Sequence, residues 1–140
     1  MARSYTYIEE ACARARARGL VVAKLSTAHG GKETWLARRR IADEVCHFYD
    51  AGTHRKVFVP QSRLAGTDRI IVRVLVRNKS HFIGLPTSLL ARRFPAQKPI
   101  QLWFPEDRHG APHPRTKHGI RLWDYENQWT TPRAHALAAE

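Results

Sequence analysis

The sequence predicts one α+β domain, with a mostly antiparallel or mixed sheet, open or closed as a barrel, and two short helices. Many short apolar segments bounded by Gly, Pro, Asn or Asp have the length and alternation of strands, and only two segments have helical spacing and end signals. At 140 residues and 43% hydrophobic content, the chain suits one domain with a buried core. We expect this domain to span residues 1–130 and the tail 131–140 to fray, because Thr, Pro and Ala follow Trp129.

The first helix is predicted over Thr6–Arg18. Thr6 and Glu9 have the spacing of a capping box, arginines crowd the other end, and Gly19 supplies a stop. Its apolar residues recur at helical spacing, which predicts one buried face made of Ile8, Ala11, Cys12 and Ala15.

Four strands are predicted next, with a Gly-Gly loop at residues 26–32 between the first two. The third and fourth are expected to pair as a hairpin through the turn at residues 51–53. These strands are Leu20–Leu25, Thr34–Arg40, Glu44–Tyr49 and Lys56–Pro60.

The clearest strand is Ile70–Val76, where apolar residues alternate with arginines. One face is predicted to carry Ile70, Val72, Val74 and Val76. The other carries Arg69, Arg73 and Arg77, and four strand residues span about 13 Å, so these guanidinium groups can follow a phosphate track. The alternative interpretation is a solvated outer face, since charges also protect a sheet from aggregation.

The second half of the chain is predicted to continue with His81–Leu85 as a strand. Pro86 then opens a short helix that Pro95 ends. Strands follow at Ile100–Phe104 and Ile120–Trp123, on either side of a polar loop. Core packing is the favoured interpretation for Trp103 and Trp123, and base stacking is the alternative.

The charge is strongly positive, and it is unevenly distributed. The chain has 24 Lys and Arg against 12 Asp and Glu, a net charge of +12 and a pI near 10.7. The segment Arg69–Pro105 contains no Asp or Glu. Such an excess favours a polyanion as partner, DNA ahead of RNA; an anionic membrane surface and a merely solubilising charge are the alternatives.

The same composition bears on location. The first residues lack the apolar run of a secretory leader, two cysteines do not make a disulfide scaffold, and no window approaches the roughly 18 apolar residues of a membrane span. We therefore expect a cytoplasmic protein. The preference for Arg over Lys is typical of high-GC bacteria.

Catalytic and metal-binding patterns are sparse. A metal-dependent nuclease needs converging carboxylates and a nearby Lys, but Asp68 precedes a strand without acids and no Glu-x-Lys lies on a predicted strand. His109 and His113 have zinc-ligand spacing without an accompanying cysteine pair. The sequence therefore favours a protein with no catalytic residue, no metal and no cofactor.

Nucleic-acid binding is the function that the residues favour, with a divalent-metal-dependent nuclease or a basic protein–protein module as the alternatives. Loops at residues 24–32 and 77–81 combine basic groups with hydroxyls, amides or imidazoles, which contact phosphates and base edges. Asn78, His81 and His29 are the candidates for base edges. The full candidate set is Lys24, His29, Lys32, Arg38, Arg39, Arg40, Arg73, Arg77, Asn78, Lys79, His81, Arg92 and Arg93.

Two pieces of the chain resemble a known family. HFIGLPTSLLARRFP followed by PIQLWFPEDRHG resembles the strand–Pro–helix–Phe–Pro–strand–turn pattern of B-three-like pseudobarrel DNA-binding domains, which occur in plant transcription factors and in recognition domains of bacterial restriction endonucleases. IEEACARARARGLVVAKLSTAHGGKETW is similar to the opening of the restriction-enzyme members. The resemblance implies duplex DNA held by two loop-bearing arms, with residues 24–32 as the first arm.

Overall fold

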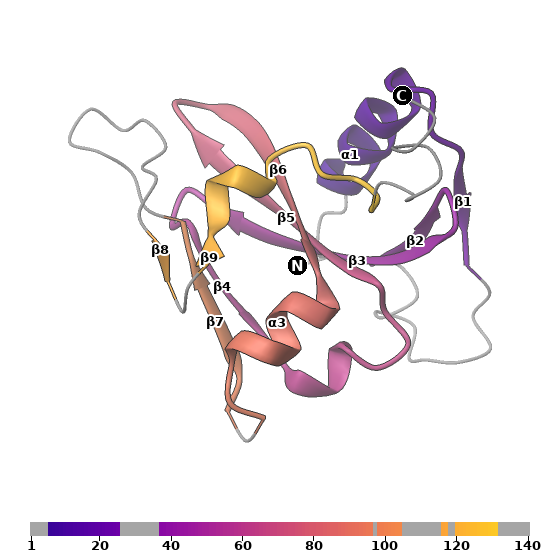
Figure 1. Cartoon of the computed structure of the whole chain (residues 1–140). Coiled ribbons are helices and arrows are strands. Elements are labelled where there is room, and N and C mark those ends of the chain that lie inside the picture. Colours follow the sequence, from indigo (N-terminus) through magenta and orange to yellow (C-terminus); the bar gives the residue numbers. More distant parts are fainter. Residues whose placement is uncertain (1–5, 26–36, 97, 105–115, 118–119, 132–140) are drawn as a thin grey trace, which may run out of the picture.

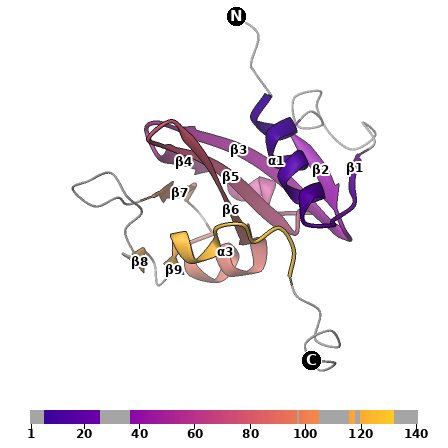
Figure 2. The same cartoon turned by 90° about the horizontal axis from the view of Figure 1, so that it is seen from above.

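A five-stranded sheet with a helix packed on one face organises the protein (Figure 1). The computed structural model describes residues 6–25, 37–96, 98–104, 116–117 and 120–131. Seen from above, the sheet lies between α1 on one side and α3 on the other (Figure 2). The predicted α+β class is confirmed. The sheet and its first helix comprise α1 (Thr6–Ala17), β1 (Val22–Lys24), β2 (Arg38–Ile41), β3 (Glu44–Gly52), β5 (Arg69–Val76) and β6 (Lys79–Pro86).

The strand order is β1-β2-β3-β5-β6, and the sheet is mixed, because β3 and β5 run parallel while the other pairs are antiparallel. Strand β4 (Lys56–Val59) pairs with β7 (Ile100–Trp103) in a separate ribbon. The predicted hairpin of the third and fourth strands is therefore wrong. Its physical reason is that β2 and β5 already occupy both edges of β3.

Short elements complete the second layer. Helix α3 (Thr87–Arg93) begins directly after Pro86, as the sequence predicted. The last predicted strand is shorter than expected, because it turns into a 3-10 helix after Arg121. The described strands leave β1 and β6 as edges of the large sheet, so they do not close a barrel. The remaining elements are η2 (Gln61–Arg63), β8 (Thr116–Lys117), β9 (Ile120–Arg121) and η3 (Leu122–Tyr125).

Strand β5 is buried on both faces, which places it between two hydrophobic cores. The predicted face of Ile70, Val72, Val74 and Val76 packs into the larger core with the β4–β7 ribbon and α3. Ile71, on the opposite face, packs under α1, whose predicted apolar stripe is buried with it. The arginine face is therefore divided. Arg69 is buried and Arg73 is partly buried, so these two form neither a solvated outer face nor an open phosphate track, whereas Arg77, just beyond the strand, is exposed.

The segment after η3 is packed against the edge strand β6. Asn127 donates its backbone N–H to the carbonyl of Phe82 over 2.8 Å, and the Trp129 ring lies 5.7 Å from the Phe82 ring. A Cβ on Gly84 would lie 1.9 Å from the Gln128 carbonyl oxygen, so only glycine permits this close approach. The hydroxyl of Thr131, the first residue of the predicted tail, accepts a hydrogen bond from Arg69; the rest of that tail lies outside the described residues.

The tryptophans divide between core and surface. Trp123 is buried, as expected, and its ring lies edge-on to Phe104 at 5.9 Å. Trp103 is 38% exposed, so the prediction that it belongs to the core is wrong. The reason is the register of the ribbon: Ile100 and Leu102 face the core, and Trp103 therefore points away from it.

Candidate nucleic-acid interface

The tip of the β5–β6 hairpin presents three exposed polar side chains, those of Arg77, Asn78 and Lys79. Val76 and Lys79 pair across a two-residue loop. The φ angles of 53° at Arg77 and 64° at Asn78 are those of a type I′ turn, which matches the twist of a hairpin. Asn tolerates this left-handed conformation well. The turn type fixes the backbone geometry of the tip.

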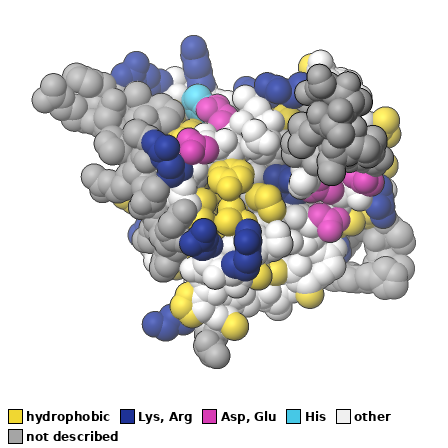
Figure 3. All heavy atoms as spheres, viewed as in Figure 1, with side chains coloured by type: hydrophobic (Ala, Val, Ile, Leu, Met, Phe, Trp, Pro, Cys, Tyr) yellow, Lys and Arg dark blue, Asp and Glu magenta, His cyan; other side chains and the backbone are white. Residues whose placement is uncertain are grey.

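A second exposed basic group lies at the end of α3, where Arg92 and Arg93 point into solvent. The two groups are far apart. The register pairs Arg69 with Pro86 at the foot of the hairpin, and eight residues of β5 span about 25 Å. Figure 3 shows Lys and Arg gathered over the hairpin tip and over α3, with hydrophobic and acidic side chains between them. The predicted cationic residues of this region therefore do not converge on one surface.

Two further candidates of this region are engaged inside the protein. Arg73 makes a bidentate contact with Asp50, with Nε–Oδ1 at 2.9 Å and Nη2–Oδ2 at 2.6 Å, and its guanidinium lies 5.5 Å from the Tyr7 ring centre. The hydrogen bond to Asp50 raises the pKa of Arg73 further. His81 places Nδ1 2.6 Å from Oε2 of Glu126. Asp50 and Glu126 thus already contact the side chains of Arg73 and His81 in the absence of a ligand.

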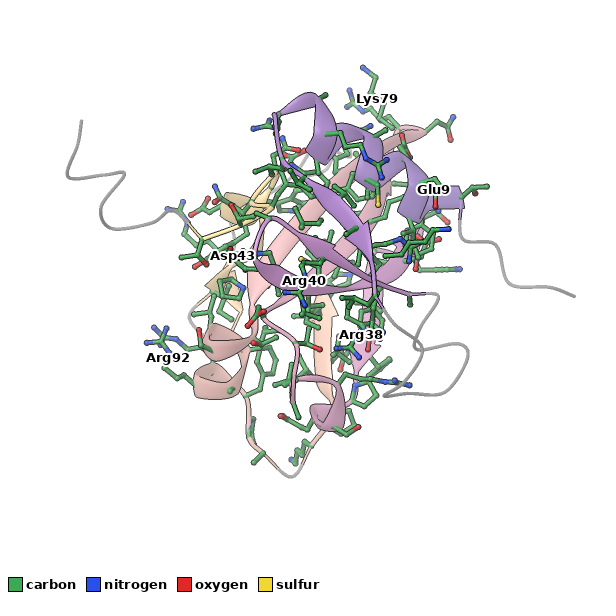
Figure 4. All side chains as sticks on the ribbon, turned by 90° about the vertical axis from the view of Figure 1, so that its right-hand side faces the viewer. Glu9, Arg38, Arg40, Asp43, Lys79 and Arg92 are labelled. Atoms are coloured by element: carbon green, nitrogen blue, oxygen red, sulfur yellow. The ribbon has the colours of Figure 1, made fainter. Side chains whose placement is uncertain are left out.

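The three consecutive arginines of β2 are divided between the faces of the sheet. Arg39 is buried on the α1 side, where its Nη2 lies 3.4 Å from Oε1 of Glu9. Lys24 pairs with Arg39 in the register, so it shares that face, and its side chain is exposed. Arg38 and Arg40 point the other way, and Figure 4 shows them together on β2, well apart from both Lys79 and Arg92.

Arg38 belongs to a cationic cluster that the sequence did not reveal. Its neighbour across the strands is the buried His47, and Arg63 of η2 approaches the same imidazole. Burial first, and then the charges of Arg63 and Arg38, lower the pKa of His47 to about 4. Arg63 was missed because no local pattern links η2 to His47 of β3.

A pocket between the start of β3 and the start of α3 is acidic. This pocket of about 440 Å³ is lined by Asp43, Glu44, Asp68, Pro86, Thr87, Ser88 and Thr131. Two of its carboxylates already have internal partners. Glu44 binds Arg69 with Oε1 3.1 Å from Nε, and Asp68 accepts the backbone N–H of Val45 over 2.8 Å. This pocket carries negative charge, which does not suit a phosphate.

Several residues that the sequence singled out belong to parts of the chain that the structure does not describe. His29 and Lys32, both predicted to contact nucleic acid, lie outside the described residues, as do His109 and His113. In the described ranges, no group of three or more His, Cys, Asp or Glu is placed to hold a metal ion. Among the helices described, none is long and apolar enough to cross a membrane.

Comparison of the chain with known protein families, curated proteins and solved structures gives no match. The resemblance to pseudobarrel DNA-binding domains therefore stays a prediction. Its strand–Pro–helix segment corresponds to β6, Pro86 and α3 in the structure.

Proposed function

We propose that the protein binds nucleic acid, duplex DNA ahead of RNA, and that it does so without cleaving it. The observation that carries the proposal is the sorting of charge between interior and exterior. Several described acids pair with basic groups that are buried or partly buried, as Glu44 does with Arg69 and Asp50 with Arg73. Among the exposed cations, Arg121 pairs with Asp124. Six others make no ion pair with a described acid, and these are Lys24, Arg40, Lys56, Lys79, Arg92 and Arg93. These cations therefore face solvent. A nucleic acid that binds them releases the counterions condensed on its phosphates, which favours binding.

The β5–β6 hairpin is the element that best suits a duplex. A two-stranded ribbon is one of the two structures that the major groove of B-DNA admits. The tip offers Arg77 and Lys79 for phosphates or guanine, and Asn78 for adenine, with the backbone of the turn fixed. We place the main contact at this tip rather than at α3, because the short helix presents only the two adjacent arginines at its end.

A salt series tests the proposal. Fluorescence anisotropy with labelled duplex DNA, single-stranded DNA and RNA is expected to show affinity that falls steeply with salt, with a log–log slope of about −0.9 per phosphate neutralised on duplex and about −0.7 on single strands. A flat salt response, or no binding at physiological salt, contradicts the proposal and favours a protein–protein module.

The same nucleic acids, incubated with Mg²⁺ or Mn²⁺, test for cleavage. The proposal expects the strands to remain intact. Cutting that is lost in Asp43→Ala or Asp68→Ala, which alter the acidic pocket, would replace the proposal with a metal-dependent nuclease.

A further inference from the structure

The β4–β7 ribbon exposes two aromatic rings on its outer face. In its register Lys56 pairs with Trp103 and Phe58 with Gln101. Paired residues of an antiparallel ribbon point to the same side, so these four side chains share one face. Phe58 is 56% exposed and Trp103 is 38% exposed.

The inner face of the ribbon holds this arrangement in place. Val59, Ile100 and Leu102 are buried in the larger core, and Val57 packs against it. Phe58 and Trp103 are diagonal neighbours, with Cα atoms roughly 7–8 Å apart for this register. Two exposed rings are thus fixed side by side on a rigid backbone, and the core does not use either of them.

The ribbon and the hairpin tip lie at the same end of the molecule. Gly52 at the end of β3 pairs with Val74 near the end of β5, and the turn that follows leads directly into Lys56 (Figure 1). The Phe104 N–H closes this end by donating to the Arg55 carbonyl over 2.8 Å. The sequence of residues 51–67 contains no Asp or Glu, and neither does that of residues 87–104.

We propose that Phe58 and Trp103 form a stacking platform for the unpaired bases of a single-stranded nucleic acid. The inference rests on the proposed function and deepens it, because it names a strand with accessible bases as a partner of the same basic end. Aromatic rings on a sheet surface, bordered by cations that follow the backbone, are the structure that binds single strands. Lys56 supplies such a cation on the ribbon itself, and Lys79 supplies another at the hairpin tip.

An apolar protein partner suits this face less well. Protein interfaces bury a contiguous apolar patch of several hundred Å². Here Lys56 and Gln101 occupy the other diagonal of the same face, so polar groups interrupt the apolar area. Alternating rings and hydrogen-bonding groups fit successive bases and phosphates.

The test compares three ligands of matched length. These are an oligothymidylate of about 12 nucleotides, within the range of site sizes of sheet-surface binders, an abasic strand with the same phosphates, and a duplex. The variants are Phe58→Ala and Trp103→Ala. Each variant is expected to weaken oligothymidylate binding about tenfold. Its affinity for the abasic strand, its affinity for the duplex and its salt slope are expected to stay as in the wild type.

Two further variants separate stacking from folding. Trp103→Phe keeps a ring and is expected to restore most of the affinity for oligothymidylate. Val21→Ala removes another exposed apolar side chain, 75% exposed and next to β1 rather than on the ribbon, and is expected to change nothing. Unchanged circular dichroism of all variants establishes that the fold is retained.

Each outcome has a distinct meaning. If the wild type binds all three ligands with the expected salt slope but the alanine variants bind oligothymidylate equally well, the stacking inference is wrong and the proposed function stands. Equal affinity for the abasic strand leads to the same conclusion. If the wild type binds none of the ligands, the proposed function itself is wrong. Wild-type dimers in sedimentation that Trp103→Ala converts to monomers would identify the face as a protein contact.

Discussion

Arg69 and Glu44 form an ion pair between β5 and β3, with Nε 3.1 Å from Oε1 and with Arg69 only 2% exposed. The guanidinium also donates to the Gly84 carbonyl over 3.0 Å and to the Thr131 hydroxyl over 2.7 Å. One buried cation therefore ties together the parallel strand pair, the edge strand and the C-terminal segment. Its position in an acid-free stretch of sequence suggested an exposed charge, but its role is structural.

Glu44→Gln is expected to destabilise the protein by about 3–5 kcal/mol, because it leaves the buried Arg69 charge without its counter-charge. Urea unfolding measures the free energy. The matched control is Glu9→Gln, which removes the carboxylate beside Arg39 where the acid is 66% exposed, and it is expected to cost less than about 1 kcal/mol. Equal losses in the two variants would show that the Arg69 pair has no special structural role.

His47 is expected to make the protein sensitive to mild acid. Its pKa falls from 6.5 to about 4 on folding, through burial and then through the charges of Arg63 and Arg38. The unfolded chain therefore takes up the proton first, so stability is complete above about pH 6.5 and is lost as the pH falls toward 4. Between pH 6.5 and pH 4, the contribution of His47 to the free energy of unfolding is expected to fall by about 3 kcal/mol.

Comparison of the wild type with His47→Gln isolates this contribution from that of the carboxylates. Urea unfolding between pH 7 and pH 4 is expected to show a shallower loss of stability in the variant. Parallel curves for the two proteins, or an NMR titration in which His47 protonates near its ordinary pKa, would contradict the expected behaviour.

Lys79→Ala is expected to weaken nucleic-acid binding uniformly across sequences and to reduce the salt slope by about one, because it removes one phosphate contact at the hairpin tip. Arg92→Ala, on α3 beyond the foot of the hairpin, removes another exposed cation and is the matched control. Anisotropy over a salt series distinguishes them. A larger change for Arg92→Ala would move the interface from the hairpin to α3.

The local signals of the sequence were sufficient wherever neighbouring residues decide the structure. The capping and stop residues predicted the first helix, which ends one residue before the expected Arg18. The alternation in β5 predicted which of its residues share the larger core, and Pro86 predicted the start of α3. In each case the relevant contacts lie within the element or are fixed by its period.

Long-range pairing decided what the sequence did not show. Strand β3 pairs in parallel with β5, and nothing in either segment reveals that choice over a hairpin with β4. That pairing brings Asp50 to Arg73, so a cation that the strand pattern placed on an open track has an internal partner. The exposure of Trp103 follows from its register with β4, since aromatic residues in an apolar strand are normally buried.

Gly84→Ala is expected to destabilise the protein by about 3 kcal/mol or more and to detach the segment that carries Trp129. The new Cβ would lie 1.9 Å from the Gln128 carbonyl oxygen and 3.2 Å from Cδ of Arg69, and the first of these is backbone that cannot turn aside. Tryptophan emission is expected to shift to the red as the buried Trp129 meets water. Gly19→Ala has a positive φ of 83° but no atom near its Cβ, so it should cost about 1 kcal/mol of backbone strain without the red shift. An identical spectrum for both variants would mean that Gly84 is not what holds this segment against β6.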